Sequence, residues 1–293
     1  MGASADFSEY VFHLTDALLP FDLKKTFECG QCFRWNLHED FYEAVVSDHL
    51  LRVSIKYNDF FVKVYPKCDG LYDFLYNYFD FGVNYNEINR ELEAKDNVLK
   101  KAVYTASGIR LLNQDFFETL ISFIISANNN IPRIKKCIEL LCENYGKILC
   151  ETGGKKYYSF PEPETLAELK PEELQKIARV GYRGDYIVNS AKYYSENPGV
   201  YDVLKHTESE SEVLKLMKAF KGCGNKVSNC VLLFSGLRRD AFPVDVWVER
   251  MLVNLYGLKD MNRLQMEKFG KEYFGKSAGI SQQYLFYYVR EEG

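Results

Sequence analysis

The sequence predicts an α+β protein in which an N-terminal antiparallel β-sheet lobe precedes mainly α-helical lobes. Three stretches between residues 21 and 65, FYEAVV, LRVSIKY and FVKVY, alternate as strands do and are separated by polar, turn-prone residues. After residue 70 the apolar residues follow helical spacing. The chain has 293 residues, enough for two or three lobes. We expect a sheet lobe with flanking helices at residues 1–114 and a helical region at residues 115–293.

The first helix expected in the second region lies in DFFETLISFIISANNN, which begins at Asp115. Asp115 is a typical N-cap, and the nearly continuous apolar residues that follow predict a buried helix. Pro132 near the start and Gly146 at the end mark the next helix. The stretch PEELQKIARVG repeats this pattern, with Pro171 first and Gly181 last.

The next predicted feature is a helix-hairpin-helix at about residues 212–236. The stretch SEVLKLMKAF has apolar residues at helical spacing and leads directly into the turn KGCG. A second apolar helix should begin at about Asn225. Gly222 and Gly224 would let the chain reverse and let backbone N–H groups approach an anion such as a DNA phosphate. An ordinary corner between two helices is the alternative.

The overall charge and the cysteines exclude several classes of function. The net charge of −4 argues against a nucleic-acid binder, but six cations gather in one segment, at Lys215, Lys218, Lys221, Lys226, Arg238 and Arg239. Cys29 and Cys32 form a CxxC without a second CxxC or a nearby histidine pair, so we expect reduced thiols and no zinc or redox site. No closely spaced four-cysteine cluster near the C-terminus suggests an iron–sulfur centre.

The most apolar stretch, LISFIISA at residues 120–127, is too short to span a bilayer, and the N-terminus lacks the pattern of a signal peptide. We therefore expect an intracellular protein that does not bind membranes. It would be found in the cytoplasm or nucleoid of a prokaryote, or in the nucleus of a eukaryote.

Two charged residues near the hairpin are candidates for catalysis. Lys226 lies in the first turn of the predicted second helix, where the helix dipole disfavours a cation. Partial burial there would lower the pKa of the amine and increase its neutral, nucleophilic fraction. Asp245 follows nineteen positions later in FPVDVW, after Pro243 and between two valines. Taken alone, each residue is ordinarily a solvated charge.

The hairpin followed by this aspartate resembles the helix-hairpin-helix superfamily of base-excision DNA glycosylases, and GCGNKVSNC with FPVDVW is similar to its 8-oxoguanine branch. Further stretches resemble that family's motifs in the same order, namely CGQCFRW (29–35), GIRLLNQD (108–115), SANNNIPRI (126–134), GYRGDY (181–186) and GISQQYLF (279–286). The resemblance covers nearly the whole chain. It implies an enzyme that excises 8-oxoguanine from duplex DNA and then acts as a lyase at the abasic site.

The resemblance also implies the catalytic roles. Lys226 corresponds to the nucleophile that attacks C1′ of a flipped nucleotide and forms a Schiff base, which permits β-elimination. Asp245 corresponds to the carboxylate that caps a helix and stabilises positive charge on the sugar. No organic cofactor and no catalytic metal are expected. The implied partner is duplex DNA with 8-oxoguanine opposite cytosine, bound by a monomer.

Four residues correspond to the family's base-binding pocket. The carbonyl of Gly30 would accept the N7–H that 8-oxoguanine has and guanine lacks. Cys230 and Phe286 would lie against the two faces of the base, and Gln282 would read its Watson–Crick edge. Cys230 as a small buried apolar residue and Gly30 as an ordinary turn residue are the structural alternatives.

Other residues correspond to the family's DNA contacts. Asn128 would fill the gap left by the extruded base, and Tyr182 would act as a wedge between bases. Arg133 and Arg183 would read the orphaned partner base, although surface arginines are the alternative. The backbone at Gly222 and Gly224 would contact a phosphate.

Two positions depart from the family pattern, and two other functions remain open. Trp247 occupies a position where relatives commonly have histidine, and Lys221 a position where proline is usual. One alternative is a helix-hairpin-helix glycosylase for another damaged base, and the other is a non-catalytic module that binds damaged DNA. Retention of both Lys226 and Asp245 argues against the second.

Overall fold

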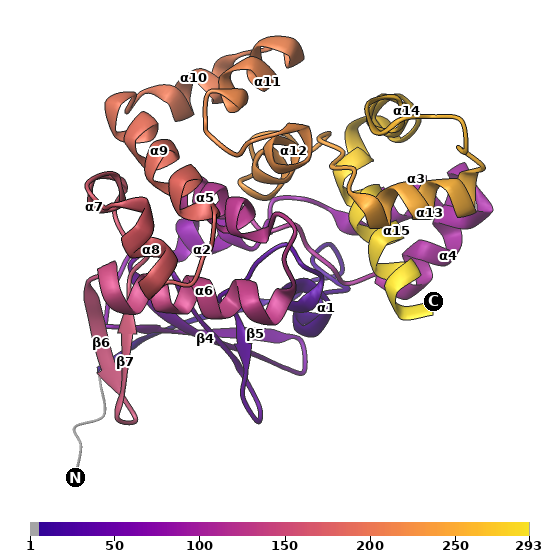
Figure 1. Ribbon diagram of the computed structural model, residues 1–293. Helices are drawn as coiled ribbons and strands as arrows, with labels where there is room; N and C mark the ends of the chain where they lie inside the picture. Colours follow the sequence, from indigo (N-terminus) through magenta and orange to yellow (C-terminus); the bar gives the residue numbers. More distant parts are fainter. Residues whose placement is uncertain (1–5, 293) are drawn as a thin grey trace. The chain divides into compact units, whose positions relative to one another are not determined.

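The computed structural model describes residues 6–292, which form two compact units (Figure 1). The first unit contains the residues up to Leu14 together with Cys32–Leu75 and Gln114–Cys223. The second contains Thr15–Gln31, Tyr76–Asn113 and the residues from Gly224 onward. Each unit therefore combines stretches from both sides of residue 114, and the expected division there stays a prediction.

The first unit contains the predicted antiparallel sheet. Its five strands are ordered β1-β5-β4-β3-β2, all antiparallel, with the bounds β1 (Ser8–His13), β2 (Asn36–Leu37), β3 (Tyr42–Val46), β4 (His49–Lys56) and β5 (Asp59–Tyr65). Phe60, Val62 and Val64 on β5 are fully buried, whereas Phe61 and Lys63 between them are partly exposed. This period-two burial confirms the sheet that the alternating sequence predicts.

The prediction that strands begin at about residue 21 is wrong. Residues 23–28 form the helix α1 (Leu23–Glu28), because Asp22 caps it by accepting a hydrogen bond from the amide of Lys25 at 2.9 Å. The first strand, β1, lies before this region. It pairs with β5, a partner about fifty residues away along the chain.

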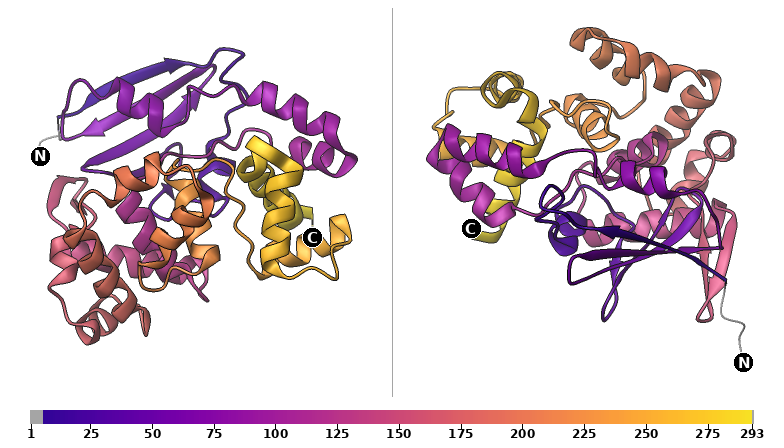
Figure 2. Two further views of the ribbon diagram at one scale, coloured as in Figure 1. Left: turned by 90° about the horizontal axis from the view of Figure 1, so that it is seen from above. Right: turned by 180° about the vertical axis from the view of Figure 1, so that it is seen from behind.

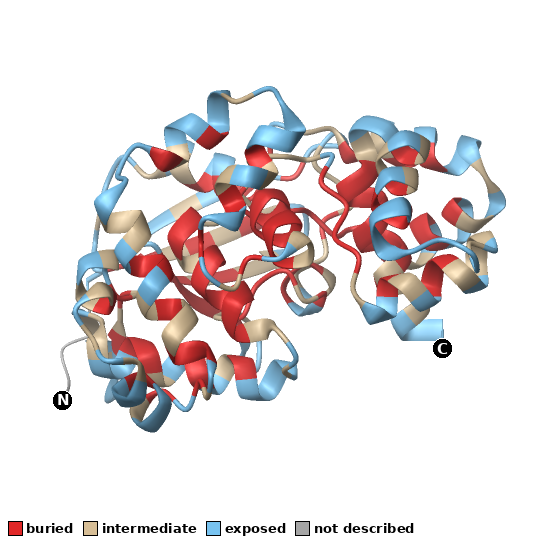
Figure 3. Cartoon of the chain, turned by 45° about the horizontal axis from the view of Figure 1, so that its top comes forward, coloured by how far each residue is buried: buried red, intermediate tan, exposed pale blue. Residues whose placement is uncertain are grey.

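Seven helices complete the first unit in the described part of the chain and lie to one side of the sheet (Figure 2). They are α5 (Phe116–Ser126), α6 (Ile131–Tyr145), α7 (Pro163–Ala167), α8 (Pro171–Ile177), α9 (Arg183–Glu196), α10 (Val200–His206) and α11 (Glu210–Lys218). Asp115 caps α5 as predicted, since its carboxylate accepts the amide N–H of Glu118 at 2.7 Å. The helix α5 is buried along nearly its whole length, as expected. Figure 3 shows the buried residues, in red, gathered on the faces where helices pack together.

Helical spacing does not continue unbroken after residue 70. A hairpin of two strands, β6 (Ile148–Thr152) and β7 (Lys155–Tyr158), follows α6. Its Tyr157 packs with Val45, Leu50 and Tyr65 of the main sheet in one buried apolar cluster. The hairpin is therefore stabilised by packing on residues about a hundred positions earlier, which local spacing does not reveal.

The second unit is helical within the described residues. It contains α1, α3 (Tyr85–Lys95), α4 (Asn97–Ala106), α12 (Asn225–Phe234), α13 (Val246–Tyr256), α14 (Arg263–Phe274), a 3-10 turn (Gly275–Ser277) and α15 (Ala278–Glu292), while α2 (Tyr72–Tyr78) continues along the chain from one unit into the other. In this unit α15 packs against α4, α13 and α14. Among the described residues, no helix has both the length and the apolar composition needed to cross a membrane.

A buried arginine explains one of the quoted motifs, GIRLLNQD. Arg110 is fully buried, and its guanidinium donates hydrogen bonds to the carbonyls of Asp80 at 2.8 Å and Leu18 at 2.9 Å. It also lies over the ring of Tyr85, at 4.6 Å from the ring centre. A buried guanidinium needs such partners, so the motif supports the packing of the second unit.

Candidate functional site

The predicted helix-hairpin-helix is present as α11, a tight turn and α12. Gly222 has φ +91°, and a side chain there would also meet the ring of Tyr186 at 2.9 Å, so the turn needs glycine. Gly224 has φ −75° and no such requirement, but no atom lies within 4 Å of where its Cβ would be. No side chain caps α12 in the described structure, so its first amide groups can donate hydrogen bonds to a bound anion.

Lys226 and Cys230 lie one turn apart on α12. Lys226 is partly buried and Cys230 is buried. Burial raises the pKa of the Cys230 thiol, Asp245 acts in the same direction, and the nearby, hydrogen-bonding Lys226 side chain opposes both. The structure therefore brings these three predicted residues together, and it favours a neutral thiol beside the amine.

Asp245 is the N-cap of α13. One carboxylate oxygen, Oδ1, accepts hydrogen bonds from the amides of Trp247 and Val248, both at 2.9 Å. These two bonds and the positive end of the helix dipole stabilise the carboxylate and fix its orientation. The cap implied by the resemblance is present, and it leaves Oδ2 outside the capping interaction.

Gln282 and Phe286 lie one turn apart on α15. Gln282 is buried, and its Oε1 has no hydrogen-bond partner in the described part of the chain. A buried amide oxygen without a partner is costly, as expected where a ligand supplies the missing donor. Phe286 is partly exposed. Gly279 sets the position of α15, since a Cβ there would collide with Leu233 on α12.

Gly30 lies just after α1 with φ +91°, a conformation that favours glycine. It is partly exposed, and no atom lies within 4 Å of where its Cβ would be. This geometry leaves room for a ligand close to its backbone. The structure gives no direct contact between Gly30 and the predicted residues on α12 or α15.

Two glutamines that hold this turn were missed in the sequence. Gln283 donates from Nε2 to the carbonyl of Cys29 at 2.9 Å, and Gln31 donates to the carbonyls of Thr26 and Arg110, each at 2.8 Å. Both glutamines are buried. Their only signal in the sequence is position, because each is adjacent to a predicted base-binding residue.

The predicted DNA contacts other than Gly224 lie in the first unit, and three of them meet. Asn128 is exposed and has φ +50°, which is uncommon for a residue other than glycine. The guanidinium of Arg183 donates to the carbonyls of Ala127 and Asn128, the second at 2.9 Å. It also lies 4.5 Å from the ring centre of Tyr182, which is 53% exposed.

Arg183 is therefore a buried support of the Asn128 loop in this structure, with 4% of its surface exposed. Arg133 is exposed in the first turn of α6, which Asn130 caps by accepting the Arg133 amide at 3.1 Å. Both arginines lower the pKa of the Cys137 thiol, although burial raises it overall. The two guanidinium groups thus lie near the same point, and direct reading of a base by either stays a prediction.

Comparisons with known proteins assign the chain to a family. Residues 14–120 match the N-terminal domain of 8-oxoguanine DNA glycosylase, and residues 121–276 match the HhH-GPD superfamily of base excision DNA repair proteins. The chain belongs to the HhH-GPD superfamily of base excision DNA repair proteins. The resemblance found in the sequence is thereby confirmed.

Similar proteins extend over almost the whole chain. The N-glycosylase/DNA lyase OGG1 of Arabidopsis thaliana is 30% identical over 90% of this chain and 76% of its own length. The structure of the Clostridium acetobutylicum 8-oxoguanine glycosylase/lyase with duplex DNA containing cytosine opposite 8-oxoG has a TM-score of 0.86 and 38% identity, over 93% of this chain and 92% of that one. The structure of MBOgg1 with a low-affinity DNA ligand has a TM-score of 0.90 and 39% identity, over 97% of this chain and 96% of that one.

The structure shows the contacts of Trp247 and Lys221, the two residues that depart from the family pattern. Trp247 lies in the first turn of α13, is 63% exposed, and has the Arg250 guanidinium 5.4 Å from its ring centre. Lys221 is exposed, and its Nζ lies 2.6 Å from the carboxylate of Asp185. The ion pair links the hairpin turn to α9, so replacement of the usual proline adds a contact without removing the turn.

The eight cysteines of this HhH-GPD protein are free thiols. Burial raises the pKa of Cys29 to about 11, and the residue forms no disulfide with Cys32. Among the described residues, no group of three or more His, Cys, Asp or Glu side chains is arranged to hold a metal ion.

Proposed function

We propose that this base excision repair protein removes 8-oxoguanine from duplex DNA, where the lesion lies opposite cytosine, and then cleaves the DNA strand as a lyase. The observation that carries the proposal is the grouping of Lys226 and Cys230 on α12 with Asp245 at the start of α13. A partly buried amine beside a fixed carboxylate can perform both steps without another nucleophile. The named activities of the relatives support this assignment.

In the first step Nζ of Lys226 attacks C1′ of the flipped nucleotide. The bond from Nζ to C1′ forms while the bond from C1′ to the base breaks, and the base leaves with the bonding electrons and takes up a proton. The sugar carries positive charge in the transition state. Asp245, held by its two amide hydrogen bonds, stabilises that charge.

In the second step the amine bonded to C1′ opens the sugar ring and becomes a Schiff base. The Schiff base acidifies the hydrogens on C2′, and loss of one of them expels the 3′ phosphate by β-elimination. Water then hydrolyses the Schiff base and regenerates Lys226. The sequence of steps consumes water and needs no oxidant or organic cofactor.

Recognition of the base involves the remaining predicted residues of the second unit. The carbonyl of Gly30 would accept the N7–H of 8-oxoguanine, whereas the N7 of guanine is an acceptor and would be repelled. The open space around Gly30 and the unpartnered Oε1 of Gln282 both support a ligand at these positions. Cys230 and Phe286 would contact the two faces of the base. Such an enzyme works where the cell keeps its DNA, in the nucleoid-containing cytoplasm of a prokaryote or in a nucleus.

Borohydride reduction tests the nucleophile. Wild-type protein incubated with an 8-oxoguanine duplex and borohydride should form a covalent protein–DNA adduct, because reduction fixes the Schiff base. Lys226→Gln should form no adduct while still binding the duplex. Lys221→Gln, which alters an exposed lysine of the same hairpin, serves as the control and should still be trapped. Equal adduct yield from Lys226→Gln would overturn the assignment.

A further inference from the structure

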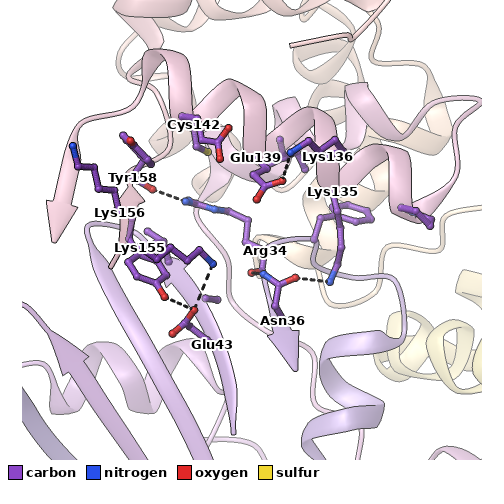
Figure 4. A pocket seen from close by; sticks show the side chains of 17 residues that line it. Arg34, Asn36, Glu43, Lys135, Lys136, Glu139, Cys142, Lys155, Lys156 and Tyr158 are labelled. Carbon is purple, nitrogen blue, oxygen red and sulfur yellow. Dashed lines mark hydrogen bonds and ion pairs between the residues drawn. The ribbon is translucent and has the colours of Figure 1, made fainter. Parts of the chain in front are cut away.

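A pocket of about 280 Å³ in the first unit is lined by residues with no role in the proposed catalysis (Figure 4). Its walls are one side of α6, from Pro132 to Glu143, and the strand β7, and β3 contributes part of the lining. Five cationic side chains and three carboxylates line it, namely Arg34, Lys135, Lys136, Lys155 and Lys156 with Glu43, Glu139 and Glu143. The lining is therefore net positive, in a protein whose overall charge is negative.

Two of the three carboxylates already have partners. Glu43 is buried, and its carboxylate lies 2.8 Å from Nε of Arg52 and accepts a hydrogen bond from the Tyr157 hydroxyl at 2.8 Å. Glu139 lies 2.8 Å from Nζ of Lys136. These pairs offset the negative charge that would otherwise repel an anion.

The cations on the β7 side are weakly engaged. Nζ of Lys155 is 3.8 Å from the Glu43 carboxylate, and the Lys155 side chain is 57% exposed. Lys156 is also exposed and makes no hydrogen bond or ion pair within the described part of the chain. Arg34, between the two walls in Figure 4, is instead held in place by the Tyr158 carbonyl at 2.6 Å and the Glu118 carboxylate at 3.2 Å.

The order of charges along α6 is unfavourable for the helix itself. Arg133, Lys135 and Lys136 lie in its first two turns, whereas Glu139 and Glu143 come later. Cations near the N-terminus and carboxylates towards the C-terminus are the reverse of what the helix dipole favours. An anion bound beside the first turns would offset this cost, because it would interact favourably with both the cations and the dipole.

From this arrangement we infer that the pocket binds a phosphate group between the lysines of β7 and those of α6, with Arg34 between them. The phosphate could come from two sources, the DNA backbone away from the lesion or a free nucleotide. The DNA source rests on the proposed function, and it is favoured because α6 also carries Arg133. The phosphate chemistry itself does not depend on that function.

The test removes the net positive charge of the lining with the double substitution Lys155→Gln and Lys156→Gln. Lys100→Gln with Lys101→Gln is the matched control, because it changes two consecutive exposed lysines on α4 in the other unit. Circular dichroism checks that both variants fold. Two binding measurements then distinguish the sources of the phosphate.

In the first measurement, fluorescence anisotropy gives the affinity for a duplex of about three helical turns containing an abasic-site analogue, between about 50 and 200 mM salt. If the pocket binds DNA, the slope of log affinity against log salt should fall by about 1 to 2 in the pocket variant relative to the control. The second measurement is calorimetry with pyrophosphate and with dGMP. If the pocket binds a free nucleotide, both ligands should bind to the wild type and the control, and the pocket variant should lose this binding.

A change in either measurement supports the phosphate site and identifies its source. If the pocket variant matches the control in both, the inference is overturned. The calorimetric result does not depend on excision. Failure of borohydride trapping by the wild-type protein would therefore refute the proposed function, whereas calorimetry would still decide whether the pocket binds phosphate.

Discussion

Replacing Asp245 by asparagine and by alanine should separate its role as a helix cap from its role as a charge. Oδ1 accepts the amides of Trp247 and Val248, both at 2.9 Å. An asparagine side-chain oxygen can accept the same two bonds, and asparagine is as good an N-cap as aspartate. Alanine provides no acceptor, and neither variant carries the negative charge.

The expected stabilities follow from these contacts. Loss of an N-cap costs roughly 0.5–2 kcal/mol, and because Asp245 is partly exposed, water can replace part of the lost bonding. We expect Asp245→Ala to lower the free energy of unfolding by about 1 kcal/mol, which corresponds to a fall of about 1–2 °C in Tm for a chain of this size. Asp245→Asn should remain within about 0.5 kcal/mol of wild type.

Excision should respond differently, because both variants lose the charge that stabilises the developing positive sugar. Removing a single preorganised electrostatic group typically slows an enzyme by about 100- to 1000-fold. We expect both variants to lose activity on this scale. Single-turnover excision of 8-oxoguanine measures the rate, and thermal unfolding measures the stability. If Asp245→Asn excised the base at the wild-type rate, the role of the charge would be refuted. If both substitutions lowered the stability equally, the role of the cap would be refuted.

Three further predictions concern other residues. Gln283→Leu should lower the free energy of unfolding by about 1–3 kcal/mol in urea titrations, because the carbonyl of Cys29 loses its buried donor; unchanged stability would show that this bond is dispensable. Trp247→Ala should change the free energy of unfolding by less than about 0.5 kcal/mol in urea titrations, since the side chain is 63% exposed, and a larger loss would show that its contact with Arg250 stabilises α13. Cys29 and Cys223, whose pKa values burial raises to about 11 and about 12, should hardly form thiolate near pH 8 and should react with iodoacetamide more slowly than the partly exposed Cys68, as mass spectrometry can check. Labelling of Cys29 at the rate of Cys68 would contradict the effect of burial.

Features that depend on neighbouring residues could be predicted from the sequence. Alternation along FVKVY predicts the sheet, and Asp115 before an apolar run predicts the start of α5, because strand period and helix caps are local properties. The hairpin could be found for the same reason, since Gly222 lies between two amphipathic patterns. The family resemblance then added roles for Lys226 and Asp245 that single charged residues do not reveal.

The features that only the tertiary structure decided depend on contacts between residues far apart along the chain. Gln283 holds the turn before Gly30 from a position 254 residues after Cys29, and Arg183 is buried against a loop about 55 residues earlier. The hairpin β6–β7 forms where Tyr157 can pack on the main sheet. A long polar or aromatic side chain has the same local sequence signal whether it faces water or a distant carbonyl, so its role is set by which segments folding brings together.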